Sequence, residues 1–162
     1  MKGYLLGAMM LAALAAPAEA RNFAVPDKNP AVTLTVPDKW DIDEIEYGYS
    51  AKSPDGGIFF SVEYAGKKKL DSMMAANKKW MKENKIDASV KAQEREMDFG
   101  GTKGEVVRFD TTDANGKTLV DFVFLDGGKD QVIMLTLWGS EEERADNKAA
   151  IAAIMASVKP IN

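Results

Sequence analysis

Four side chains on three successive predicted strands could together form a polar site. Arg108 and Asp110 lie on the first strand, Asp121 on the second and Trp138 at the end of the third. An arginine beside two carboxylates and an indole ring could line a groove that binds a polar ligand or a cation. The same charges could instead form an internal ion network beneath a helix or at the sheet edge. Both interpretations depend on how the strands pair.

The first hairpin is predicted from the Asn115-Gly116 pair, a frequent two-residue turn between antiparallel strands. With these two residues in the loop, Asp110 lies directly opposite Asp121, and Arg108 lies diagonal to it. Two opposed carboxylates repel, whereas a diagonal arginine could neutralise one of them. We therefore expect Arg108 and Asp121 to interact.

The second hairpin decides whether Trp138 joins this group. If Gly127-Gly128 form its turn, Asp121 lies opposite Met134. Because side chains alternate between the two faces of a sheet, Trp138 then shares a face with Asp121. The sequence thus predicts one mixed face, with Arg108, Asp121 and Trp138 among apolar residues.

The composition excludes the commonest catalytic and metal sites. The 162 residues include no histidine and no cysteine, so an imidazole base, a thiol nucleophile and a zinc–thiolate site are absent. The acidic segments 41–44 and 126–130 lack the spacing of a calcium loop and are interpreted as turns. No phosphate-loop or serine-hydrolase motif is present. We expect no catalytic residue, no metal and no cofactor.

Lysines gather on one predicted helix. Residues 67–85 contain seven lysines and two carboxylates, a local charge of +5 in a chain whose net charge is −4. Lys78, Lys79, Lys82 and Lys85 lie away from the apolar stripe of this helix. Such a face could be merely solvated, or it could dock on an acidic protein or an anionic lipid surface.

The N-terminus is typical of an export signal. Lys2 precedes an apolar run at 4–16, which is shorter than the roughly 20 residues that span a bilayer. Residues 17–20 end in a small-x-small pattern, so we expect cleavage after Ala20 and a periplasmic product. The remaining chain is mildly acidic, which disfavours nucleic-acid binding. Residues 21–30 are expected to form an extended N-terminal arm.

Residues 31–162 are predicted to form one α+β domain. Alternating and helical apolar spacings give the order β-β-β-α-β-β-β-β-α, which favours an antiparallel sheet flanked by helices. A Ser140/Glu143 capping box starts the closing helix. The expected strands are 32–36, 44–52, 58–64, 89–99, 105–112, 118–125 and 131–138, and the expected helices are 70–85 and a segment that ends near 158.

Several segments together resemble the PsbP-like α/β/α sandwich family, and within it the DcrB-type periplasmic proteins. They are the strand end Val36-Pro37-Asp38-Lys39-Trp40, the Ser53-Pro54-Asp55-Gly56 turn, the strand with Gly104, and the closing Ala156-Ser157-Val158. The resemblance implies this sandwich fold over the mature chain. It also implies a non-catalytic accessory, docking or chaperone-like role, and it supplies no catalytic residue.

We therefore expect an exported, non-catalytic accessory protein that docks to another protein or to an envelope component. The alternatives are a carrier of a small polar ligand or cation that uses the mixed sheet face, and a carboxylate-dependent hydrolase. A helix that fully covers the mixed face would remove the ligand site and favour the lysine-rich helix as the docking surface. An open pocket with converging polar groups would favour the ligand.

Overall fold

The structure is a computed structural model, and it describes residues 20–26, 28–99, 101–128 and 130–161. The predicted export signal thus lies outside the described residues, apart from Ala20. No helix within the described part of the chain combines the length and the apolar character that crossing a membrane requires.

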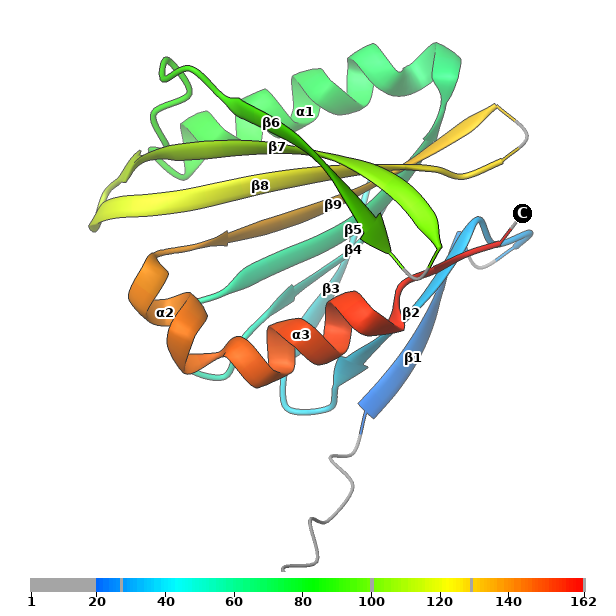
Figure 1. Cartoon of the computed structure of the whole chain (residues 1–162), viewed down its shortest axis with the longest axis horizontal. Helices are drawn as coiled ribbons and strands as arrows, with labels where there is room; N and C mark the ends of the chain where they lie inside the picture. Colours follow the sequence, from blue (N-terminus) through cyan, green and yellow to red (C-terminus); the bar gives the residue numbers. More distant parts are fainter. Residues whose placement is uncertain (1–19, 27, 100, 129, 162) are drawn as a thin grey trace, which may run out of the picture.

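The main sheet has seven antiparallel strands in the order β3-β4-β5-β9-β8-β7-β6 (Figure 1). A smaller sheet has the order β1-β2-β10. The strands are β1 (Ala20–Val25), β2 (Val32–Pro37), β3 (Asp41–Ile45), β4 (Gly48–Lys52), β5 (Phe59–Gly66), β6 (Gln93–Phe99), β7 (Thr102–Asp113), β8 (Gly116–Asp126), β9 (Gln131–Gly139) and β10 (Lys159–Pro160).

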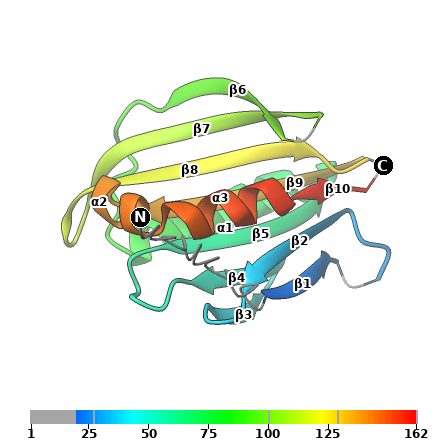
Figure 2. The ribbon, with the colours of Figure 1, turned by 60° about the horizontal axis from the view of Figure 1, so that its bottom comes forward.

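Helices lie on both faces of the main sheet. The helix α1 (Leu70–Glu83), preceded by the short turn η1 (Lys67–Lys69), covers one face. The other face is covered by α2 (Glu141–Asp146), α3 (Lys148–Ser157) and the small sheet (Figures 1 and 2). The predicted α+β sandwich is confirmed.

Several predicted segments differ in detail from the structure, and the expected strand 89–99 begins only at Gln93. The expected strand 44–52 is a hairpin of β3 and β4, and the chain turns just before Gly48. A side chain at Gly48 would collide with the backbone carbonyl of Val62 on the adjacent strand, so this close approach requires glycine. The expected closing helix is divided at Asn147 into α2 and α3.

The segment expected as an extended arm is also a paired strand. Residues of β1 pair along the whole of β2, from Ala20 opposite Pro37 to Val25 opposite Val32. Arg21 donates a hydrogen bond of 2.8 Å to the backbone oxygen of Trp40. The first residues after the predicted cleavage site are therefore part of the fold.

Each face of the main sheet has its own apolar core. On the α3 side, Phe60, Val123 and Leu135 pack with residues of the small sheet and with Ile154 of α3. On the α1 side, Phe122 and Met134 pack with the helix stripe. The predicted stripe of α1 is confirmed, because all of its members are buried or half-buried: Leu70, Met73, Met74, Asn77, Trp80 and Met81.

One carboxyl group lies within the α1-side core. Glu63 of β5 is 6% exposed, and it accepts a hydrogen bond of 3.1 Å from the Asn77 side chain of α1. Burial raises the pKa of Glu63 to about 7, and the Asn77 hydrogen bond offsets only part of that rise. The folded protein therefore holds a proton here that the unfolded chain releases near pH 4.5.

The Glu63 carboxyl should make stability fall as the pH rises. Between about pH 4.5 and 7 the folded state binds more protons than the unfolded state, so the free energy of unfolding decreases across this window. A shift of this size corresponds to about 3 kcal/mol. We expect Glu63→Gln to be more stable than the parent by up to about 3 kcal/mol at pH 8, with little gain at pH 4.5.

Urea unfolding at both pH values measures this difference. The control is Glu44→Gln on β3, which makes the same change at an exposed carboxyl group. A gain for Glu63→Gln that is the same at pH 4.5 and pH 8 would contradict the assignment.

Candidate functional site

Arg108 and Asp121 lie directly opposite each other on β7 and β8. The expected opposition of Asp110 and Asp121 is wrong, because Asp110 pairs with Leu119 instead. The turn contains Ala114 and Asn115, and Asp113 pairs with Gly116. Two features stabilise this turn: the Asp113 side chain accepts a hydrogen bond of 2.7 Å from the backbone N–H of Asn115, and Gly116 has a positive φ of 125°.

The expected position of Trp138 on the Asp121 face is also wrong. The strand β8 ends at Asp126 and β9 begins at Gln131, so the connection is longer than two glycines and Asp121 lies opposite Leu137. Two backbone hydrogen bonds stabilise the loop: the N–H of Gly127 donates to the oxygen of Gln131, and the N–H of Gln131 donates to the oxygen of Gly128. The register differs from the expected one by three residues, and an odd shift moves every β9 side chain to the other face.

Trp138 consequently belongs to the α1 side of the sheet. Its ring lies 5.5 Å from that of Trp80 and 6.4 Å from that of Phe59, between ring centroids. Its indole N–H donates a hydrogen bond of 3.1 Å to Asp113. Of the four predicted site residues, the structure thus brings Arg108 and Asp121 into contact, leaves Asp110 exposed beside them, and separates Trp138 from them.

A second arginine completes the contact around Asp121. Arg108 donates two hydrogen bonds to the Asp121 carboxylate, at 2.6 and 2.8 Å, and Arg144 of α2 donates a third at 2.6 Å. The side chain of Asp121 is only 6% exposed. Burial alone would raise the pKa of Asp121, but the hydrogen bonds and charges of both arginines outweigh it and hold that pKa below its usual value.

Arg144 also joins α2 to the ends of two strands. Its guanidinium donates to the backbone oxygens of Gly139 at 3.0 Å, Leu119 at 2.8 Å and Leu137 at 2.8 Å. The predicted Ser140/Glu143 capping box begins α2 and fixes the turn that carries Arg144 to this place. Arg144 was not among the site residues predicted from the sequence. The sequence feature that could have indicated its role is its position directly after Glu143 of the capping box.

This geometry matches the internal ion network that was the alternative to a ligand site. Both Asp121 oxygens accept hydrogen bonds from guanidinium groups, so the carboxylate has little capacity to bind a cation or to accept a proton. A strongly held, deprotonated carboxylate is also a weak general base. We conclude that this trio positions α2 on the sheet and lines one end of a neighbouring hollow.

The basic hollow is an opening of about 290 Å³ between α3 and the β6–β7 part of the sheet. Four cationic residues line it: Arg95, Arg108, Arg144 and Lys148. Its remaining lining is mostly apolar and includes Met97, Phe99, Val123, Ile151 and Met155. Arg95 and Lys148 are exposed, and neither forms an ion pair within the described residues. The helix therefore covers the mixed face only in part.

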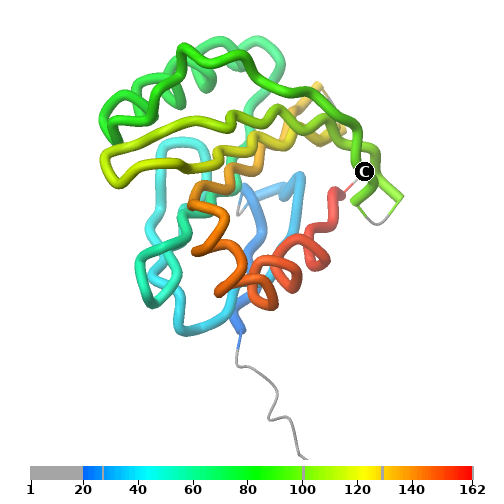
Figure 3. Tube along the Cα trace, turned by 60° about the vertical axis from the view of Figure 1, so that its left-hand side comes forward, coloured from blue at the N-terminus to red at the C-terminus, as the bar shows by residue number. Residues whose placement is uncertain are grey.

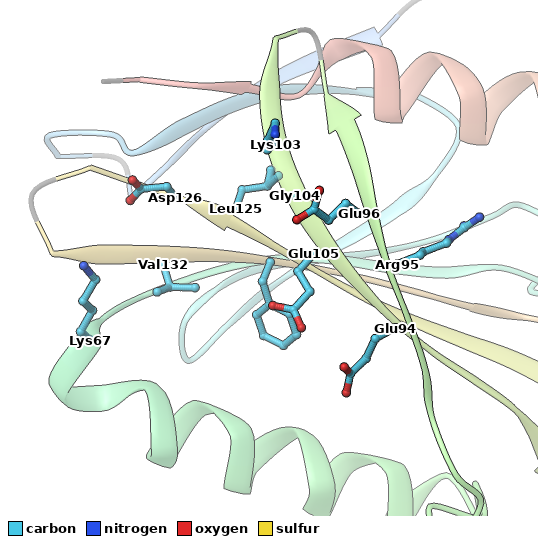
Figure 4. A pocket seen from close by; sticks show the side chains of 11 residues that line it. Lys67, Glu94, Arg95, Glu96, Lys103, Gly104, Glu105, Leu125, Asp126 and Val132 are labelled. Carbon is cyan, nitrogen blue, oxygen red and sulfur yellow. The ribbon is translucent and has the colours of Figure 1, made fainter.

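The acidic hollow is a larger opening of about 730 Å³ on the other face of the same strands (Figure 4). Its charged lining consists of four carboxylates and three cationic residues: Glu94, Glu96, Glu105, Asp126, Lys67, Lys103 and Arg95, which also borders the basic hollow. The ring of Phe124 lines it as well. Figure 4 shows the side chains of Glu94 and Glu96 on one side of β6 and that of Arg95 on the other. Within the described residues, no group of three or more carboxylates is placed to hold a metal ion.

The four candidate docking lysines lie elsewhere. Lys78, Lys79 and Lys82 are exposed on α1, whereas Lys85 follows the helix with a positive φ of 57°. Lys79 forms an ion pair of 3.6 Å with Glu83. These lysines line neither hollow.

Comparison with known proteins finds no matching family model and no matching curated protein. Solved structures do match. Cyanobacterial PsbP from Synechocystis sp. PCC 6803 matches with a TM-score of 0.60 at 10% identity, over 96% of this chain and 99% of that protein. A protein of Bacteroides thetaiotaomicron matches with a TM-score of 0.56 at 11% identity, over 87% of this chain and 48% of its own length. The chain therefore has a PsbP-like fold, as the resemblance in its sequence predicted.

The Asp121 network should contribute strongly to stability. Asp121→Asn leaves two guanidinium groups, one of them nearly buried, without a counter-charge, and we expect a loss of about 3 kcal/mol in the free energy of unfolding at pH 7. Because the pKa of Asp121 is lowered by folding, the difference from the parent should shrink as the pH falls through that pKa. Asp110→Asn is the matched control, and its exposed side chain should change stability by less than about 0.5 kcal/mol. Equal losses for both variants in urea unfolding would contradict the assignment.

Proposed function

We propose that this chain, with its PsbP-like fold, is an exported, non-catalytic accessory protein that docks to another protein or envelope component through the β6 margin of its sheet. One observation carries the proposal. The strand β6 ends the order of the main sheet, and it lies between an acidic hollow on one face and a basic hollow on the other. Hollows that combine apolar area with charges are typical of binding surfaces.

The lysine-rich surface of α1 is a weaker candidate for docking. Its apolar stripe is used in the core, and its lysines lie on the convex outer surface of a helix. Exposed charges of this kind attract partners over a distance but supply little of the binding energy. The β6 margin offers charges, apolar side chains and concave shape together.

Export is supported by the N-terminal sequence and is compatible with the fold. Cleavage after Ala20 would leave Arg21 to Val25, which pair with β2, in the mature protein. The absence of catalysis is supported by the sequence, which has neither histidine nor cysteine, and by the Asp121 carboxylate, whose hydrogen bonds to two arginines make it a poor base.

Affinity capture from the envelope of the native host tests the docking surface. The full chain is expressed in that host. The measured mass of the periplasmic protein is expected to be that of a chain whose first residue is Arg21. We expect a partner to be captured by the parent and by the control Asp43→Lys on the opposite edge strand β3, and to be lost with Glu96→Lys. If the Glu96→Lys variant still captures the partner but the Lys82→Glu variant does not, the docking surface lies on α1. Capture of no partner by the parent would overturn the proposal.

A second candidate function is the binding of an amphipathic anion in the basic hollow. The cation carrier expected from the sequence fits this hollow poorly, because four cationic side chains surround a single carboxylate that is already paired. An anionic head group could instead contact Arg95 and Lys148, while an alkyl chain contacts the apolar lining.

Calorimetry with matched detergents tests this second function. Below its micelle concentration, dodecanoate should bind at least about tenfold more tightly than dodecyltrimethylammonium, since each factor of ten requires only about 1.4 kcal/mol. Arg95→Glu should remove that preference, and Glu142→Lys on the exposed surface of α2 should not. Equal affinity for the two detergents would exclude an anion site.

A further inference from the structure

The outer edge of β6 is open for pairing with another strand. The strand pairs with β7 over seven residues, from Gln93 opposite Arg108 to Phe99 opposite Thr102. No described strand pairs with its other side. Figure 3 shows it running along the outer margin of the molecule. An edge strand presents a row of backbone N–H and C=O groups that can pair with an added strand.

Side chains of β6 have opposite character on the two faces of the sheet. Glu94 and Glu96 point to the acidic hollow, where Glu105 pairs with Glu96 on the neighbouring strand. Arg95 and Met97 line the basic hollow on the α3 side, and Met97 is 39% exposed. Successive residues of a strand added to β6 would therefore meet acidic and mostly apolar surroundings in turn.

The other edge of the sheet lacks these features. The strand β3 has five residues against the seven of β6, and neither hollow includes any of its residues. Its Ile42 packs against the α3-side core. Of the two edges, only that of β6 has room on both faces for the side chains of an added strand.

A second copy of this chain would pair poorly with the open edge of β6. Antiparallel pairing of two β6 strands about a two-fold axis at Glu96 would place Glu96 opposite its copy, and Glu94 opposite the Asp98 of that copy. Like charges directly opposite each other destabilise a strand pair. A partner with cationic side chains at these positions would instead form opposite-charge pairs with Glu94 and Glu96.

We infer that β6 binds an extended segment of another protein by strand addition, and that this segment carries lysine or arginine at alternate positions and aliphatic residues between them. The cationic side chains face Glu94, Glu96 and Glu105, and the aliphatic ones contact Met97 and the apolar lining of the basic hollow. Backbone hydrogen bonds supply affinity, and the alternation supplies specificity. This inference rests on the proposed docking function and names its mode and partner chemistry.

Synthetic peptides test the inference directly on the purified protein. A nine-residue peptide of sequence TKIKVKLKT should bind at least about tenfold more tightly than its charge-reversed form TEIEVELET, measured by fluorescence anisotropy. The Glu96→Lys variant should reverse this preference, whereas Asp43→Lys on β3 should preserve it. Unchanged unfolding midpoints for both variants establish that they fold.

Backbone methylation separates strand addition from simple charge attraction. Two versions of the cationic peptide carry N-methyl groups at alternate residues, one at the odd positions and one at the even positions. In a bound strand only one of these sets faces β6. We expect one version to lose at least about tenfold in affinity, and the other to stay within about twofold of the parent peptide.

Four results would overturn the inference: no binding of the cationic peptide, equal binding of the two charge forms, equal effects of both methylation patterns, or dimerisation of the protein alone that Glu96→Lys abolishes. None of these four results determines the outcome of the envelope capture, which tests the docking function separately. Loss of captured partner with Glu96→Lys, together with equal methylation effects, would retain the docking site and exclude strand addition as its mode.

Discussion

The arrangement of the α3 side depends on the contact between Arg144 and the sheet. The guanidinium of Arg144 binds Asp121 and three backbone oxygens at the ends of β8 and β9. An arginine that uses its donors in this way fixes both the position and the direction of the helix that carries it. Since α3 follows α2 after Asn147, this contact also sets where α3 crosses the sheet, and so where the basic hollow opens.

Two buried carboxyl groups lie on opposite faces of the sheet, and their environments differ. Asp121 is bound by two guanidinium groups, whose charges favour the carboxylate form and lower its pKa. Glu63 has only the neutral Asn77 amide as a partner, so burial favours the protonated form and raises its pKa. Each carboxyl group thus takes the protonation state that its neighbours can stabilise. The α3 side consequently has a permanent ion network, while the α1 side has a group that titrates near neutral pH.

Most of the fold could be predicted from the sequence because its signals are local. The spacing of apolar residues along the sequence identified the main strands and the α1 stripe, and the capping box located the start of α2. The candidate site depended on loop lengths, which are harder to predict. The predicted register of β7 and β8 was wrong by two residues, and a shift by an even number leaves Arg108 and Asp121 on the same face, directly opposite each other. The predicted register of β8 and β9 was wrong by three residues, and a shift by an odd number moves Trp138 to the other face. Arg144 could not be assigned because its partners are distant in sequence and are defined only by the packed sheet.

The charges on β6 admit a simpler explanation, which is protection of an exposed edge against aggregation. Protection alone requires charge but no particular distribution between the faces. In this strand the carboxylates of Glu94 and Glu96 share one face, while Arg95, Met97 and Phe99 share the other. The separation continues beyond β6, since Glu105 extends the acidic face and Lys148 of α3 extends the basic one. The neighbouring strand β7 divides its charges in the same way, with Glu105 on the acidic side and Arg108 on the basic side. The edge therefore both repels a second copy of itself and presents complementary surroundings to a strand of alternating cationic and apolar residues.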